Sequence, residues 1–91
     1  MAENLDEKNL IDPETLDATV RALKKMQKDA DKISLVKSTA AAFKFESGHA
    51  AAIIEAVRYL NPQLEAGILL LPHVTDREQW HVALAKMNYW E

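Results

Sequence analysis

The stretch SGHAAAIIEAVRYLNPQLEAGILLLP, residues 47–72, predicts an all-α fold. Apolar residues recur in it at spacings of three or four, which places them on one face of a helix. Ser47 is the expected N-cap of the first helix, and Asn61-Pro62 opens the second as a capping side chain followed by proline. The first helix presents a stripe made of Ala50, Ile53, Ile54, Val57 and Leu60.

The second helix of this stretch, expected over about residues 62–71, is apolar nearly all round. Leu64, Ile68 and Leu71 share one face, and Leu69 and Leu70 widen it. Because a helix that is apolar on all sides is typical of a protein interior, we predict that this is the central and most buried helix.

Two further helices precede residue 47. The first is expected over 13–28, where Asp12 is a good N-cap and Pro13 suits the first helical position. The second starts near Asp29 or Asp31 and ends near Phe43. Both have apolar stripes with helical spacing, formed by Leu16, Val20 and Leu23 in the first and by Ile33, Val36, Ala40 and Phe43 in the second.

A fifth helix is expected over 76–88, because Thr75 and Glu78 have the spacing of a capping box. Its core face would carry Trp80, Leu84 and Met87. The prediction is therefore an all-α domain of five short helices in an irregular orthogonal bundle. Helices two and three and helices four and five also suggest two helix-pair repeats with a period of about 30 residues.

Composition and charge limit the classes of protein. The chain of 91 residues is one domain, with an acidic flexible tail expected over 1–11 and the helical domain over 12–91. It has no cysteine, and its acidic N-terminus lacks the apolar core of a secretory signal. The longest apolar run, 67–71, is too short to span a bilayer. We expect a soluble intracellular protein, cytoplasmic or nuclear.

Five segments also carry a family resemblance: Asp31-Lys32-Ile33, Phe45-Glu46-Ser47, IIEAVRYL at 53–60, PQLEA at 62–66, and Val74-Thr75-Asp76. Together, residues 31–84 resemble a family of helical domains of unknown function carried by proline- and serine-rich protein 1 and by some bacterial proteins. Gly48 and His49 depart from that family's pattern. The resemblance implies a helical module without known catalysis and assigns no functional residue.

A run of basic residues follows the first acidic segment. At the spacings of a continuous helix these side chains would lie on one side, where they could bind phosphate, an acidic partner or an anionic membrane. A solvated face opposite the apolar stripe explains the same pattern. The basic stripe consists of Arg21, Lys24, Lys25, Lys28 and Lys32.

Aromatic residues near the end of the chain are the other candidates for binding. Trp80 lies on the expected core face, whereas Tyr89 and Trp90 follow the last helix. Because tryptophan and tyrosine are enriched as interface anchors, these three residues are candidates for an interface with another protein or a second copy. Core packing explains Trp80 as well, and packing onto the domain's own helices is the alternative for Tyr89 and Trp90.

Catalytic and metal-binding patterns are weak. Glu78 and His81 form a single Glu-x-x-His pair, whereas a helical di-metal site needs two pairs and further carboxylates. Ser47 and His49 stand two positions apart, which points them away from each other on a helix. We therefore expect no catalytic residue, no metal, no cofactor and no enzymatic activity.

These observations favour a small protein-protein interaction or scaffold module that presents an apolar and aromatic surface near the fifth helix. The alternative is a nucleic-acid-binding domain that uses the basic stripe, although the net charge of −3 argues against it.

Overall fold

The computed structural model describes residues 8–88, and over this range the fold is all-α, as predicted. Over this range there are five α-helices, and two short 3₁₀ turns lie between the fourth and the fifth. In chain order the elements are α1 (Pro13–Lys25), α2 (Asp29–Ala42), α3 (Ser47–Val57), α4 (Leu60–Leu70), η2 (Leu71–His73), η3 (Arg77–Gln79) and α5 (His81–Leu84).

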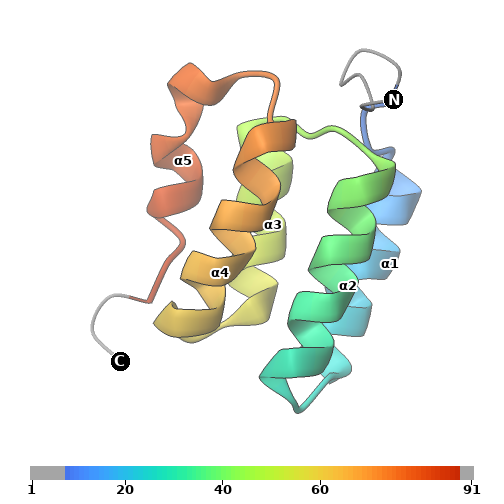
Figure 1. Ribbon diagram of the computed structural model, residues 1–91, viewed down its shortest axis with the longest axis vertical. Helices are drawn as coiled ribbons and strands as arrows, with labels where there is room; N and C mark the ends of the chain where they lie inside the picture. The colour runs from blue at the N-terminus through green and yellow to red at the C-terminus, as the bar shows by residue number, and fades with distance from the viewer. Residues whose placement is uncertain (1–7, 89–91) are drawn as a thin grey trace.

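The helices form two rows. In one row α3 packs between α1 and α5, and in the other α2 packs against α4. Contacts between α3 and α4 join the rows, so that helices that follow each other in the sequence alternate between them. Figure 1 shows α2 and α4 in front of α1 and α3, with these four helices running roughly side by side.

Extended segments lie together at one end of the rows. The backbone N–H of Phe45 donates to the carbonyl of His73 at 2.9 Å, and the N–H of Thr75 donates to the carbonyl of Phe45 at 2.8 Å. Phe45 precedes α3 and Val74 precedes η3, and the two residues form a parallel bridge. The segment between α2 and α3 therefore pairs with the segment between η2 and η3, which has the corresponding position in the second predicted helix pair.

The segment before α1 joins the same layer. The N–H of Ile11 donates to the carbonyl of Lys44 at 2.9 Å, and the N–H of Lys44 donates to the carbonyl of Asn9 at 3.0 Å. Ile11 is 3% exposed and belongs to the core. Residues 9–11 belong to the segment predicted as a flexible tail from its polar composition, but in the structure their backbone is paired and one side chain is buried.

The centre of the core is α3, which corrects the prediction for α4. Ile53, Ile54 and Val57 are all fully buried on α3, whereas Leu64 and Ile68 on α4 are exposed. The spacing of apolar residues did not identify the inward face of α4, because apolar residues occur all round this helix. The side that packs inward carries mostly small or polar residues, namely Pro62, Gln63, Ala66, Gly67 and Leu70.

Several helix ends differ from the prediction. Asp12 caps α1 as expected: its carboxylate accepts from the N–H of Thr15 at 3.1 Å. The hydrogen bonds from Thr15 also hold the pKa of Asp12 below its ordinary value. However, α1 ends at Lys25, three residues early, and α4 begins at Leu60 instead of Pro62. The residue before the first turn of α3 is Glu46, whose N–H donates to Nδ1 of His49 at 3.1 Å, so Ser47 is not the N-cap.

The predicted fifth helix is much shorter than expected. Residues 77–79 form a 3₁₀ turn, and the α-helix covers only His81–Leu84. The expected capping box between Thr75 and Glu78 does not open an α-helix, because the chain there turns to pack against the start of α3. Two side chains, those of Asp76 and Thr75, bond across to residues 45–47.

Candidate docking groove between the fourth and fifth helices

A groove of 140 Å³ lies between the outer flank of α4 and the segment that contains α5. Its lining is apolar throughout. The groove has one wall from α4 and the turn after it and another from the C-terminal segment, and its residues are Leu64, Gly67, Ile68, Leu71, Trp80, Leu84 and Met87.

The rim of the groove is exposed to solvent. Ile68 is 73% exposed, Leu64 is 42% exposed and Leu84 is 39% exposed. Leu64 and Ile68 on α4 and Leu71 at the start of η2 follow each other at spacings of four and three, so they form one stripe about 10 Å long at the usual helical rise. The face that the sequence analysis assigned to the core is therefore the wall of an open groove.

Gly67 forms the floor of the groove. A Cβ atom at this position would lie 3.3 Å from Cε of Met87 and 3.5 Å from Cζ2 of Trp80. The absence of a side chain lets both residues approach the backbone of α4 closely. A glycine in the middle of a helix lowers helix stability, so its place here follows from this close packing.

Gln63 holds the C-terminal end of the groove in position. This side chain is fully buried, and its Oε1 accepts from the N–H of Asn88 at 2.7 Å while its Nε2 donates to Oδ1 of Asn88, also at 2.7 Å. Nε2 also lies 3.1 Å from the carbonyl of Ile54 on α3. The chain after α5 is thereby tied across α4 beside Met87. Sequence reasoning missed Gln63, since a single glutamine in an apolar helix gives no signal of burial.

The other end is held by Asp76. Its Oδ1 accepts from the N–H of Ser47 at 2.6 Å and from the hydroxyl of Ser47 at 3.0 Å. Beyond it, Nη2 of Arg77 donates to the carbonyl of Pro72 at 2.9 Å. These bonds fix the turn from which Trp80 enters the groove, so both walls are positioned by polar contacts to neighbouring elements.

The predicted aromatic sites have different outcomes. Trp80 lines the groove and is partly buried against the core, as its place on the expected core face predicted. Its contribution to an interface stays a prediction. Tyr89 and Trp90 lie outside the described residues. Their assignment to an interface stays a prediction.

The basic stripe is not one continuous surface. The α1 helix ends at Lys25, and a new helix begins at Asp29, so the spacing of a single helix does not extend to Lys32. Lys32 is 5% exposed, and its Nζ donates to the carbonyl of Val57 at 3.1 Å. Arg21 pairs with Asp17 at 2.6 Å. The stripe members that remain exposed are Arg21, Lys24, Lys25 and Lys28.

The residues of the weak catalytic and metal-binding patterns make structural hydrogen bonds or lie in different elements. Ser47 is 1% exposed and bonded to Asp76, and His49 accepts a hydrogen bond from the backbone of Glu46. Glu78 lies in η3, whereas His81 begins α5. Over residues 8–88 the structure brings together no group of three or more His, Asp or Glu side chains that could hold a metal ion.

Comparison with known proteins gives a family without an assigned function. A family model described as "Domain of unknown function (DUF4476)" matches residues 10–90. The matched range includes residues 31–84, which carry the resemblance found in the sequence. The narrower link to proline- and serine-rich protein 1 stays a prediction. Neither the curated proteins nor the solved structures gave a match.

Proposed function

The chain belongs to the DUF4476 family, a domain of unknown function, and we propose that its groove between α4 and α5 binds an amphipathic helix of a partner protein. The domain would act as an interaction or scaffold module without catalysis. The observation that supports this proposal is the apolar stripe of Leu64, Ile68 and Leu71 along the outer flank of α4 and the start of η2, in which Leu64 and Ile68 are exposed.

The arrangement of the two rows favours a helix as the occupant. In the second row α2 packs against one flank of α4, and Leu69 lies on that side with residues of α2. Ile68, on the opposite side of α4, faces the groove. A partner helix in the groove would pack against α4 on the flank away from α2. It would extend the row formed by α2 and α4 by one helix. Helix-in-groove binding of this kind uses anchors at spacings of three, four and seven.

The size and chemistry of the groove agree with protein side chains as ligands. Pockets for cofactors and drug-sized molecules usually enclose about 300–1,000 Å³, whereas this groove measures 140 Å³. It is also lined by apolar residues without convergent polar groups. An exposed apolar stripe of this kind on a small domain is typical of an interaction surface, and one or two large apolar anchors would fill it.

Nucleic-acid binding is less well supported. A phosphate-binding surface needs several cations that reach the backbone together. Of the predicted basic stripe, Lys32 donates into the protein and Arg21 pairs with Asp17. The four exposed members, Arg21 and three lysines, span the last turns of α1 and the connection to α2.

The proposal can be tested by affinity capture with matched variants. The native chain, Ile68→Glu and Val82→Glu would be used as baits in lysate of the source organism. Val82 is 37% exposed on α5 and does not line the groove, so it controls for the added charge. We expect the same partner to be retained by the native chain and Val82→Glu and lost from Ile68→Glu.

The identity of the occupant is tested separately by the oligomeric state. Sedimentation of the native chain should show a monomer, and the captured protein should bind through a segment with apolar residues at helical spacing. Self-association that Ile68→Glu abolishes would show that a second copy occupies the groove. Equal capture by all three baits would contradict the proposal.

A further inference from the structure

Two charged side chains lie at the edges of the docking groove. Glu65 is exposed and precedes Ile68 by three positions on α4, which makes the two residues neighbours on the helix surface. At about 100° per residue, Glu65 and Gly67 lie on either side of Ile68. Because Gly67 faces Trp80 and Met87, Glu65 lies on the edge of the groove away from α5.

Arg77 lies at the Leu71 end of the groove. It is exposed, and its Nη2 donates at 2.9 Å to the carbonyl of Pro72, the residue after Leu71. Residues three apart eclipse each other in a 3₁₀ turn, so Arg77 lies on the same side of the chain as Trp80, which lines the groove. A guanidinium group has five N–H donors, so its bond to Pro72 leaves donors for an acceptor on a bound molecule.

Neither of these two side chains has an ion-pair partner in the part of the chain that the structure describes. The ion pairs there join Arg21 to Asp17 and Lys86 to Glu55. The hydrogen bond from the guanidinium group to a backbone carbonyl is not an ion pair. The edges of the groove therefore present an uncompensated charge of each sign beside an apolar stripe.

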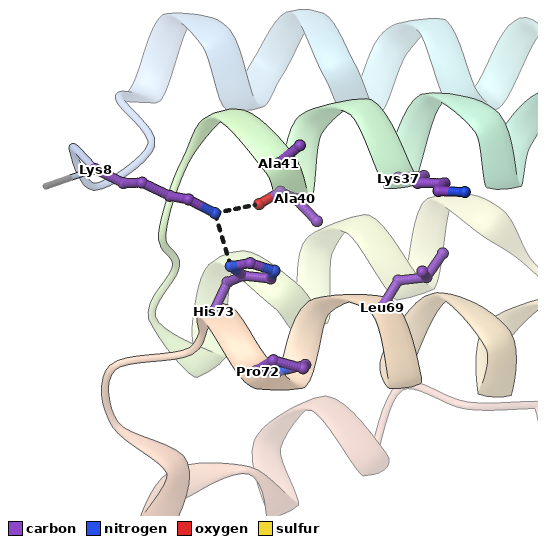
Figure 2. Close-up of a pocket in the computed structure, with 7 residues that line it drawn as sticks. All are labelled: Lys8, Lys37, Ala40, Ala41, Leu69, Pro72 and His73. Carbon is purple, nitrogen blue, oxygen red and sulfur yellow. Dashed lines mark hydrogen bonds between the residues drawn. The ribbon is translucent and has the colours of Figure 1, made fainter. Parts of the chain in front are cut away.

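The opposite flank of α4 has a different arrangement. Figure 2 shows Leu69 and Pro72 on this flank, facing α2. Its cation, Lys8, donates from Nζ to the carbonyl of Ala40 at 3.1 Å and lies 2.9 Å from Nδ1 of His73. No carboxylate lines this side. The flank on which a helix of the same chain packs thus has a bonded cation and no acid, whereas the groove has both charges at its edges.

We propose that the partner helix carries an acidic residue that meets Arg77 and a basic residue that meets Glu65, beside its apolar anchors. This inference rests on the proposed function of the groove and adds the charge pattern of the partner. Glu65 and Pro72, to which Arg77 is bonded, are seven positions apart, about 10 Å at the usual helical rise. The acid and the base would therefore stand about two helical turns apart in the partner.

Charges at the rim of an interface determine register and exclude partners that place a like charge opposite. The apolar stripe alone would accept many amphipathic helices, because it offers contacts without direction. Glu65 and Arg77 would select among these helices.

The test is a selection from a displayed library of short peptides, with apolar residues fixed at spacings of four and three and the other positions randomised. Peptides that bind the native chain and not Ile68→Glu would be sequenced, so that only groove binders count. We expect an acid and a base about seven positions apart to be enriched roughly two- to fivefold over the starting library, the effect of a surface ion pair.

Charge variants identify the residues responsible. Glu65→Lys should select an acid where the native chain selects a base, and Glu65→Lys with Arg77→Glu should exchange both charges. Asp17→Arg with Arg21→Asp reverses an exposed ion pair on α1 and should keep the native preference. The inference is overturned, and the proposed function stands, if the groove binders show no charge preference or if Glu65→Lys selects the same charges as the native chain. If no enriched peptide is lost on Ile68→Glu, the proposed function fails as well.

Discussion

The carboxylate of Asp76 accepts hydrogen bonds from both the backbone N–H and the hydroxyl of Ser47, at 2.6 and 3.0 Å. The hydroxyl of Ser47 also lies 3.1 Å from the backbone carbonyl of Asp76. Ser47 begins α3, and Asp76 directly precedes η3. The start of the central helix is therefore satisfied by the turn that leads into α5, and this contact places Trp80 against α4.

Asp76→Ala should lower the free energy of unfolding by about 1–2 kcal/mol, because it removes the carboxylate that accepts from the first backbone N–H of α3 and one of the two acceptors of the Ser47 hydroxyl. Urea denaturation followed by circular dichroism would measure the change. Glu78→Ala is the matched control. The structure predicts a change within about 0.5 kcal/mol for it, whereas an active capping box at Thr75 and Glu78 would make the two losses similar.

Lys32→Met should also destabilise the protein by about 1–2 kcal/mol, although methionine keeps most of the apolar stem. The reason is that the carbonyl of Val57 would lose the donor that now lies 3.1 Å away in the interior. Lys28→Met, at an exposed position of the same basic stripe, should be close to neutral. Equal stabilities of the two variants in chemical denaturation would show that Lys32 is not buried as described.

The two glycines should respond differently to alanine. A Cβ atom added to Gly48, in the first turn of α3, would meet nothing within 4 Å, so Gly48→Ala should stabilise the protein by about 0.5–1 kcal/mol through helix propensity. Gly67→Ala gains the same propensity but must displace Cε of Met87, 3.3 Å from the new Cβ. We expect it to be the less stable variant by about 1 kcal/mol. A larger gain at Gly67 would contradict the packing of the groove floor.

The connection between α3 and α4 contains the backbone strain of the described chain. Arg58 has φ 61° and ψ 169°, and Tyr59 has φ 52°. Because the conformation of Arg58 is one that only glycine adopts readily, Arg58→Gly should raise the free energy of unfolding by about 1 kcal/mol. Arg58→Ala keeps the strain and should show no gain. A thermal melt of the three proteins would order them.

Much of the core could be read from helical spacing. The stripe of Ile53 and Val57 on α3 is fully buried, and so is Leu23 on α1. In α1 polar residues occupy the opposite side, so the spacing identifies a single inward face, whereas α3 is buried at most of its positions. Asp12 was likewise a reliable signal for the start of α1, because its capping interaction is local in the sequence.

The candidate site could be predicted only in part. Trp80 was identified, but Leu64 and Ile68 were assigned to the interior, because an apolar interface stripe and an apolar core stripe look the same in a sequence. The inward side of α4 could not be predicted from the sequence. Its packing depends on Gly67, which allows close approach, and on Gln63, whose hydrogen-bond partners are distant in the chain.

The contacts of Lys32 and Asp76 could not be predicted from the sequence, because their partners are also distant in the chain. Lys32 bonds to a residue 25 positions away, and Asp76 to one 29 positions away. Local patterns placed the first on a surface stripe and the second in a capping box. Both assignments depend on which helix lies alongside, and this is determined by packing of the whole domain.

The central claim, that the groove beside α4 receives a partner helix, is tested most directly by photo-crosslinking from position 68. A photoreactive amino acid would replace Ile68 in one protein and Val82 in another, and crosslinked peptides would be identified by mass spectrometry. The account predicts one recurrent partner segment from position 68, with apolar residues at helical spacing, and no such segment from position 82. Crosslinks of equal yield from both positions, or none from position 68, would contradict it.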